Sequence, residues 1–198
     1  MDFPIVLASK SQARFDMLTA ANVPFTQVVP LIDEEEVKSA AVEQNAKPRD
    51  ICDLLAQMKA QKVSGKEPEA FVIGCDQVLE LDGQLLSKPS TLAQARDQLM
   101  VMRDRQHSLY SAACIFHQGR AIWRHVGTAR LLMRDFSDAY VDEYLARNWP
   151  DISHCVGGYK IEGEGIRLFS RVDGDSFVIQ GMPMFELLDF LRIQGAIS

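Results

Sequence analysis

The chain has 198 residues, of which 47% are hydrophobic and 24% are charged, a composition typical of a soluble protein with one sizeable core. Its formal net charge of −6 argues against a protein that coats duplex nucleic acid, because such a protein needs a basic stripe. This charge still leaves room for a pocket that takes one phosphorylated small molecule.

Targeting and redox signals are weak in this chain. The N-terminus, MDFPIVLASK, lacks the basic start and long apolar core of a signal peptide, and no apolar run reaches membrane-spanning length. The four cysteines form no C-x-x-C pair, so we expect them to be reduced packing residues. We therefore expect a cytoplasmic protein that binds neither membrane nor nucleic acid, with one domain over residues 1–198 and a small lobe near residues 30–65. A homodimer is one assembly that these features allow.

The first predicted unit is a strand followed by a helix. An apolar strand over residues 4–8 runs into Ser9-Lys10-Ser11, and helical spacing continues to about Asn22. Either serine can cap the helix, because a hydroxyl satisfies free backbone amides. The same amides and the helix dipole favour a bound phosphate, and Arg14 in the first turn adds positive charge. The segment therefore predicts a helix cap or a phosphate site, with the cap the commoner case.

An acidic run and a long helix come next. A second strand over residues 25–29 precedes Asp33-Glu34-Glu35-Glu36. Such a run is usually a solvated loop, but one of its carboxylates can bind Mg²⁺, which takes one or two carboxylates plus substrate phosphates. The clearest helix spans residues 50–63, and Lys59 lies beside its apolar stripe. This position predicts a lysine that either extends to water or points into a cleft.

Residues 71–89, FVIGCDQVLELDGQLLSKP, predict a hairpin. Its first strand is apolar except for Asp76 and Gln77, and Asp82-Gly83 supplies a tight turn. A carboxylate inside an apolar strand is costly unless a metal ion or ligand pairs with it. The return strand ends at Lys88, so the hairpin can bring an acid and a base to one face. The alternative is an acid at a strand end and a solvated lysine.

The remaining elements are predicted from the same periodicities. In order, they are a helix from Thr91 to about residue 104, strands over 107–116 and 121–133, a helix capped by Ser137, a glycine-rich segment over 154–169, a turn over 172–175, a strand over 177–180 and a closing helix from Pro183 to Arg192. Because strands alternate with helices and hairpins, we expect an α/β fold with a mixed sheet.

Several different short motifs follow one another in a specific order along nearly the whole chain. They are Leu7-Ala8-Ser9-Lys10-Ser11-Gln12-Ala13-Arg14, Asp33-Glu34, Leu55-Ala56-Gln57-Met58-Lys59-Ala60, Gly74-Cys75-Asp76-Gln77-Val78, Lys88-Pro89, Val156-Gly157-Gly158-Tyr159 and Gly181-Met182-Pro183. In this order they resemble the motifs of the Maf family of nucleoside triphosphate pyrophosphatases. Each motif is weak alone, and their shared order makes the resemblance specific.

The resemblance implies both a fold and a reaction. The implied fold is an elongated mixed β-sheet flanked by helices, with two lobes and a deep cleft. The implied reaction is metal-dependent cleavage of a nucleoside triphosphate between the α and β phosphates, which gives the monophosphate and pyrophosphate. The implied cofactor is a divalent cation, Mg²⁺ or Mn²⁺, and the implied partner is the nucleotide itself.

The same resemblance assigns roles to individual residues. Glu34 and Asp76 are implied metal ligands, and Asp76 is the implied proton acceptor for the attacking water. The polyphosphate needs cations and hydroxyls that neutralise and bind it. The residues implied for this purpose are Lys59, Lys88, Arg14, Ser9 and Ser11.

Three positions, Ala13, Gln77 and Glu162, govern the choice of nucleotide by analogy. The thymidine/uridine branch carries Arg, Thr and Gln there, whereas Gln77 and Glu162 resemble the branch that hydrolyses 7-methyl-GTP. A carboxylate at Glu162 can accept from guanine N1–H and favours a base made cationic by methylation. That branch has a tryptophan where Ala13 stands, so a stacking platform worth about 0.5–2 kcal/mol is missing. Two alternatives stay open: a dTTP/UTP-type pyrophosphatase, and a nucleotide-binding regulator of cell division without turnover.

Overall fold

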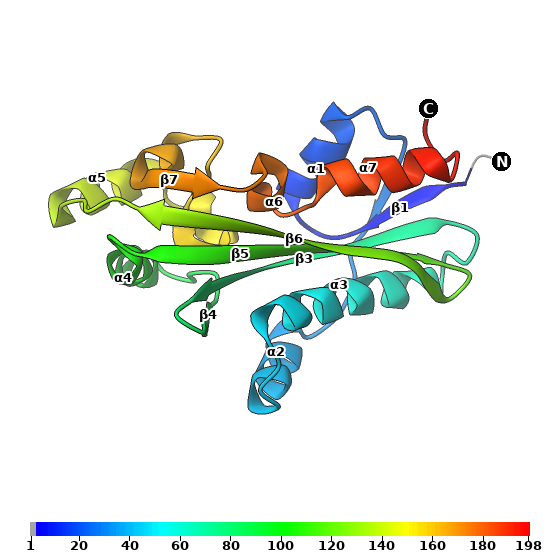
Figure 1. Ribbon diagram of the computed structural model, residues 1–198, viewed down its shortest axis with the longest axis horizontal. Helices are drawn as coiled ribbons and strands as arrows, with labels where there is room; N and C mark the ends of the chain where they lie inside the picture. The colour runs from blue at the N-terminus through cyan, green and yellow to red at the C-terminus, as the bar shows by residue number, and fades with distance from the viewer. Residues whose placement is uncertain (1–2) are drawn as a thin grey trace.

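The computed structural model describes residues 3–198 and contains a seven-stranded mixed sheet flanked by helices, which confirms the predicted fold class (Figure 1). The strands are β1 (Ile5–Ala8), β2 (Thr26–Val28), β3 (Phe71–Leu81), β4 (Gln84–Leu86), β5 (Gln106–His117), β6 (Arg120–Met133) and β7 (Phe169–Asp173). The sheet order is β2-β1-β3-β5-β6-β7, and β4 pairs with β3. Strand β1 is parallel to both its neighbours, whereas every other pair is antiparallel.

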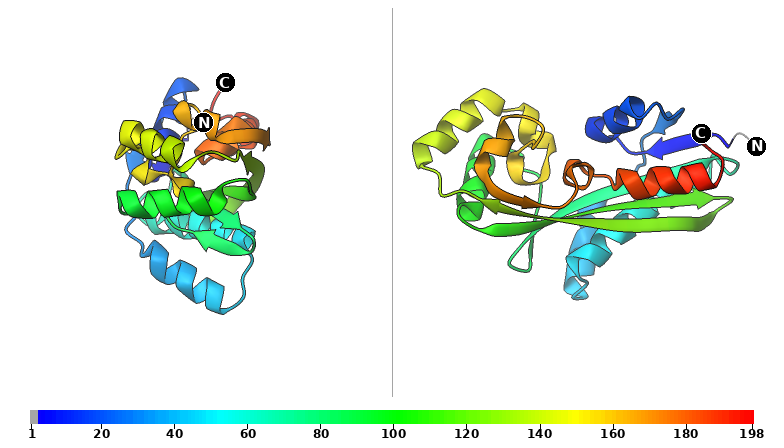
Figure 2. Two further views of the ribbon diagram at one scale, coloured as in Figure 1. Left: turned by 90° about the vertical axis from the view of Figure 1, so that its left-hand side faces the viewer. Right: turned by 45° about the horizontal axis from the view of Figure 1, so that its top comes forward.

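Helices cover both faces of this sheet. They are α1 (Gln12–Ala20), α2 (Glu34–Glu43), α3 (Pro48–Ser64), α4 (Leu92–Met102), α5 (Asp138–Asn148), α6 (Ser176–Gln180) and α7 (Met184–Ile193), with short 3₁₀ helices η1 (Asp151–His154), η2 (Val156–Gly158) and η3 (Glu164–Leu168) in the glycine-rich segment. Helices α1 and α7 lie on one face and α2 and α3 on the other, while α4 and α5 lie at the far end (Figures 1 and 2). Among the described residues, no helix is both long and apolar enough to span a bilayer.

The long strands β3 and β5 send alternate side chains to opposite faces, and both faces are buried. Ile73 and Ile115 belong to the apolar cluster that includes α1 and α7, whereas Val72 and Cys114 belong to the cluster under α3. A strand buried on both faces reads as a continuous apolar run, which is the pattern at the start of β3. The alternation also sends neighbouring residues of β3 to different helices.

The acidic run is not a solvated loop, so that expectation was wrong. Glu34 begins α2, and the side chain of Asp33 accepts a hydrogen bond of 3.0 Å from the backbone amide of Glu36. Acidic residues suit this position, because the first turn of a helix has free amides and a positive dipole end. The run therefore forms a well-capped helix start.

The predicted strand over residues 177–180 is also wrong, because this segment forms α6. Asp175 caps the helix through a hydrogen bond of 3.1 Å from the amide of Phe177, and Gly181 ends it with φ of 115°. A short apolar run does not by itself distinguish a strand from a buried helix. The turn predicted over 172–175 is shorter than expected, since β7 continues to Asp173.

The connections around β1 form a topological switch point. The chain leaves β1 through α1 to reach β2 on one side, and then crosses through α2 and α3 to reach β3 on the other side. The two crossings lie on opposite faces of the sheet (Figure 1). In open α/β sheets, ligands bind outside the carboxyl ends of the strands at such a point. The fold thus singles out the region after Ala8, which is where the sequence places Ser9 and Ser11.

Candidate active site

One edge of β3 is open near its middle. Strand β1 ends opposite Gly74, and β4 ends opposite Leu79, so in residues 3–198 no strand covers Cys75 to Val78 on this side. The other edge of the same segment pairs continuously with β5. Asp76 therefore lies in a gap beside the carboxyl end of β1, where the topology favours a ligand.

Two carboxylates from distant parts of the chain meet one ammonium group in this gap. Lys59 Nζ lies 2.6 Å from Asp76 Oδ1 and 3.0 Å from Glu34 Oε1. The side chains of Lys59 and Asp76 are only 6% and 5% exposed, whereas that of Glu34 is 28% exposed. Burial alone would raise the pKa of Glu34, but the charge and hydrogen bond of Lys59, together with the charges of Lys88 and Lys38, outweigh it and lower that pKa. Lys59 thus points into the site and does not extend to water.

A glycine in β3 allows this convergence. A Cβ atom on Gly74 would lie 2.2 Å from the carbonyl oxygen of Ala56 and 2.5 Å from the amide nitrogen of Ala60. Helix α3 therefore packs directly against the backbone of β3, closer than any side chain permits. Because Lys59 lies on this turn of α3 and Asp76 follows two residues after Gly74, the close approach brings their charges together.

Arg14 is buried at the same edge, on the side of α1. Its Nε donates to the carbonyl of Gly181 at 2.9 Å, and Nη1 donates to Ser9 Oγ at 3.3 Å and to the carbonyl of Cys75 at 3.1 Å. Within residues 3–198, Nη2 makes no hydrogen bond, so it is free for a ligand. The expectation that a serine caps α1 is confirmed, because the side chain of Ser11 accepts from the backbone amide of Arg14.

Lys88 lies beside this group of charges, just after β4. Partial burial and then the charge of Arg14 lower the pKa of Lys88, although Glu34 and Asp76 oppose the shift. Lys88 as a whole residue is still exposed to solvent, so it borders the site from the solvent side. We name the group Glu34, Lys59, Asp76, Arg14 and Lys88 the charged cluster.

Three of the residues assigned to substrate binding lie outside the charged cluster. Ala13 is half-buried on α1, and Glu162 is exposed in the glycine-rich segment and has no ion pair or side-chain hydrogen bond to residues 3–198. Gln77 points to the face opposite Asp76, where its Nε2 donates to the carbonyls of Val178 and Ile179 at 3.1 and 2.8 Å. Within residues 3–198, hydrogen bonds and ion pairs link acids and cations of the charged cluster, and none links the side chains of these three residues to it.

The charged cluster fits a divalent cation in one specific way. Asp76 Oδ2 is buried and has no hydrogen-bond partner, which is costly for a carboxylate oxygen unless a ligand supplies one. No group of three or more His, Cys, Asp or Glu side chains in residues 3–198 is placed to hold a metal. The carboxylates that could serve a cation in the charged cluster are those of Glu34 and Asp76, and two carboxylates together with substrate phosphates is a set that Mg²⁺ commonly uses.

Two polar contacts of β5 were not foreseen from the sequence. Ser111 is fully buried in β5, and its hydroxyl donates to the carbonyl of Val178 at 2.6 Å. His107 Nε2 lies 2.7 Å from the hydroxyl of Tyr159 and ties the glycine-rich segment to β5. The available signal for Ser111 was a hydroxyl next to the apolar run Ala112-Ala113-Cys114, where a buried polar group must find a partner.

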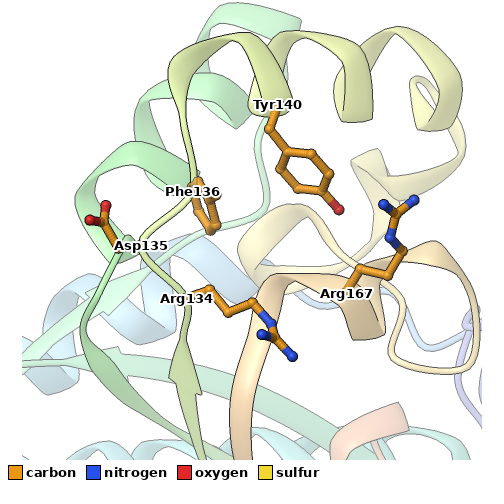
Figure 3. A pocket seen from close by; sticks show the side chains of 5 residues that line it. All are labelled: Arg134, Asp135, Phe136, Tyr140 and Arg167. Atoms are coloured by element: carbon orange, nitrogen blue, oxygen red, sulfur yellow. The ribbon is translucent and has the colours of Figure 1, made fainter.

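A separate pocket of about 350 Å³ lies at the far end of the sheet (Figure 3). It is lined by Arg134, Asp135, Phe136, Tyr140 and Arg167. The guanidinium carbon of Arg167 lies 5.6 Å from the centre of the Tyr140 ring, and Asp135 points away from the hollow (Figure 3). This pocket shares no residue with the charged cluster.

Comparisons with known proteins identify the family of this chain. The family model described as Maf-like protein matches residues 4–194. The chain is 53% identical to a Ruegeria pomeroyi protein named nucleoside triphosphate pyrophosphatase, over the full length of both chains. A Caulobacter vibrioides protein of the same name is 45% identical over 98% of each chain, and a Jannaschia protein named nucleoside triphosphate pyrophosphatase 1 is 39% identical over 98% of each. The chain therefore belongs to the Maf-like protein family.

Proposed function

We propose that this chain hydrolyses a nucleoside triphosphate to the monophosphate and pyrophosphate. Relatives that are 39–53% identical over nearly their whole length carry the name of this activity. The observation that carries the proposal is the charged cluster, where two carboxylates and three cations meet at the open edge of β3. A polyphosphate with an attacking water needs both kinds of group within a few ångströms.

The chemistry follows from the unpaired groups of the cluster. Asp76 Oδ2, which has no protein partner, accepts a proton from water as the water attacks the α-phosphorus. The bond to the α–β bridging oxygen then breaks, and pyrophosphate leaves with the electron pair. Arg14 Nη2 and Lys88 offset the charge that develops on the phosphate oxygens. Mg²⁺ or Mn²⁺ held by Glu34 and Asp76 supplies further positive charge when bound.

The substrate that we propose is 7-methyl-GTP. The exposed carboxylate of Glu162 has no partner in the described part of the chain and suits a base that is cationic and donates through N1–H. A methylated guanine meets both conditions, whereas a neutral pyrimidine offers no positive charge. The likeness of Gln77 and Glu162 to the methylguanine branch supports the same choice.

The test is a product analysis of the wild-type protein with 7-methyl-GTP, GTP, UTP and dTTP, with Mg²⁺ or Mn²⁺ and with a chelator. We expect pyrophosphate and the monophosphate, no inorganic phosphate, loss of turnover with the chelator, and the highest kcat/KM for 7-methyl-GTP. Diphosphate with inorganic phosphate would contradict the proposed reaction. Saturable binding without product under every metal would favour a regulator instead.

A charge-neutral variant tests the substrate. Glu162→Gln should lower kcat/KM for 7-methyl-GTP relative to UTP, whereas Glu67→Gln, an exposed glutamate on another segment, should leave the ratio unchanged. Turnover of dTTP or UTP that exceeds that of 7-methyl-GTP in the wild type would assign the chain to the pyrimidine type.

A further inference from the structure

Helix α6 is held against the sheet by two polar side chains, Gln77 of β3 and Ser111 of β5. Gln77 Nε2 donates to the carbonyls of Val178 and Ile179 and lies 3.0 Å from Ser111 Oγ. The Ser111 hydroxyl donates in turn to the carbonyl of Val178 at 2.6 Å. We name Gln77 and Ser111 the α6 clamp.

Chemistry fixes the direction of every bond in the α6 clamp. A backbone carbonyl can only accept, so the group of Gln77 that faces Val178 and Ile179 must be the amide NH₂ and not the oxygen. The last carbonyls of a helix have no partner within the helix, and α6 is a helix of five residues. The α6 clamp therefore supplies the Ile179 carbonyl with a partner that the backbone of residues 3–198 does not, and it adds two side-chain donors to the Val178 carbonyl.

The packing beneath α6 is equally close. A Cβ atom on Gly127 of β6 would lie 2.5 Å from Val178 Cγ2, so α6 rests on the backbone of the sheet. Val178 is buried, and its carbonyl also accepts from the amide of Gly181 at 3.1 Å. Both hydrogen bonds and packing thus fix the position of the C-terminal end of α6 on the sheet.

The end of α6 leads directly to the charged cluster. Gly181 ends the helix in a left-handed conformation, with φ of 115°, and its carbonyl accepts from Arg14 Nε at 2.9 Å. This is one of three bonds that orient the buried guanidinium, the others being to Ser9 Oγ and the carbonyl of Cys75. A shift of α6 would move the Gly181 carbonyl and so turn Nη2 away from its present direction.

We propose that Gln77 and Ser111 are positioning residues, which aim Arg14 Nη2 at a bound polyphosphate by fixing α6 and the Gly181 carbonyl. This inference rests on the proposed function, since that function places phosphate beside Arg14. It gives Gln77 a task distinct from contact with the base, because its amide nitrogen is used by α6 and only its oxygen is left for a ligand. It also gives a role to Ser111, which no motif of the sequence marked.

The first experiment observes Arg14 itself, independently of turnover. The side-chain Nε–H signal of Arg14 is followed by ¹H–¹⁵N NMR in the wild type and in Gln77→Leu, Ser111→Ala and Ser108→Ala. Ser108→Ala is the matched control, a half-buried serine of the same strand with no side-chain hydrogen bond to residues 3–198. We expect solvent exchange of this proton to accelerate by at least about two- to tenfold in Gln77→Leu and Ser111→Ala, the factor that the loss of one neutral hydrogen bond typically gives. Exchange should stay unchanged in the Ser108→Ala control.

The second experiment is a double-mutant cycle on the binding of inorganic tripolyphosphate, measured by calorimetry. Ser111→Ala should weaken binding about two- to tenfold in the wild-type background and should not weaken it further in Arg14→Gln. A merely structural role would weaken binding equally in both backgrounds and would overturn the proposal, as would an unchanged Nε–H signal in both clamp variants. Failure of the wild type to bind tripolyphosphate would contradict the proposed function. The NMR experiment would still test whether Gln77 and Ser111 stabilise the hydrogen bond of Arg14 Nε.

Discussion

Lys59 Nζ lies 2.6 Å from Asp76 Oδ1, and both side chains are almost completely buried. Lys59 comes from a helix and Asp76 from a central strand, yet their charges meet where β3 has an open edge. A buried ion pair is costly to desolvate, so its presence is weak evidence for stability alone. Its place beside Glu34, Lys88 and the free nitrogen of Arg14 instead indicates a site that binds a highly charged ligand.

Removing the ammonium group should destabilise the fold. Lys59→Gln leaves the buried Asp76 carboxylate without its partner, which costs about 3–5 kcal/mol in the free energy of unfolding at neutral pH. Lys62→Gln, an exposed lysine of the same helix, should change it by less than about 0.5 kcal/mol. Urea unfolding of both variants provides the measurement.

The difference in the free energy of unfolding between wild type and Lys59→Gln should depend on pH with a definite sign. Because Lys59 lowers the pKa of Glu34 from 4.5, the contribution of their ion pair is present above pH 4.5 and is lost as the pH falls through the lowered value. The gap in stability between wild type and Lys59→Gln should therefore narrow in acid. A gap that widens below pH 4.5 would show that the ion pair does not stabilise the charged carboxylate.

Gly74→Ala should disturb the site without removing any charge. An added Cβ overlaps the backbone of α3, so α3 must move and Lys59 with it. We expect a loss of about 1–3 kcal/mol in the free energy of unfolding together with a loss of pyrophosphate release. Gly65→Ala is the matched control, because nothing lies within 4 Å of a Cβ at that position. Equal behaviour of the two variants would mean that the close approach of α3 is not required.

Lys88 should set an alkaline limit on the reaction. Partial burial and the charge of Arg14 lower its pKa from 10.5, so in the free protein it loses its proton at a lower pH than an ordinary lysine. The alkaline limb of kcat/KM, which reports the free enzyme, should lie below pH 10.5. Lys88→Arg should move this limb upward, because a guanidinium stays protonated, whereas Lys66→Arg should not. An alkaline limb of kcat/KM at the same pH in wild type and Lys88→Arg would show that the protonation of Lys88 does not limit the reaction.

His107 should make the protein less stable in mild acid. Burial lowers its pKa from 6.5 to about 4, so between these values the unfolded chain binds a proton that the folded chain does not. The free energy of unfolding should fall as the pH drops from 6.5 toward 4, by up to about 1.4 kcal/mol per pH unit from this group. His107→Gln should flatten the slope measured by urea unfolding, and the exposed His154→Gln should keep it. Identical slopes for wild type and His107→Gln would contradict this assignment.

The sequence predicted those parts of the fold that depend on local periodicity and turn chemistry. The hairpin at Asp82-Gly83, the caps at Thr91 and Ser137 and the long strands β5 and β6 all lie close to the expected positions. The prediction of a strand over residues 177–180 was wrong, because the helix there depends on the cap at Asp175, the end at Gly181 and packing on Gly127. The apolar run does not reveal these features.

The site could be predicted in part for a similar reason. Asp76 was conspicuous as a carboxylate in an apolar strand, but the direction of Lys59 depended on how closely α3 approaches Gly74. The contacts of Gln77 with α6 depended on a helix that the sequence pattern did not predict. Long-range placement of this kind follows from tertiary packing, which a single sequence does not show.

The most direct test of the central claim is the rate of pyrophosphate release by Asp76→Asn, compared with Asp53→Asn, a largely buried carboxylate of α3 outside the charged cluster. The fold of each variant is checked by urea unfolding. If Asp76 accepts the proton of the attacking water, Asp76→Asn should remain folded and lose at least about 100-fold in kcat, while Asp53→Asn keeps its turnover. A folded Asp76→Asn protein that releases pyrophosphate at the wild-type rate would contradict the account.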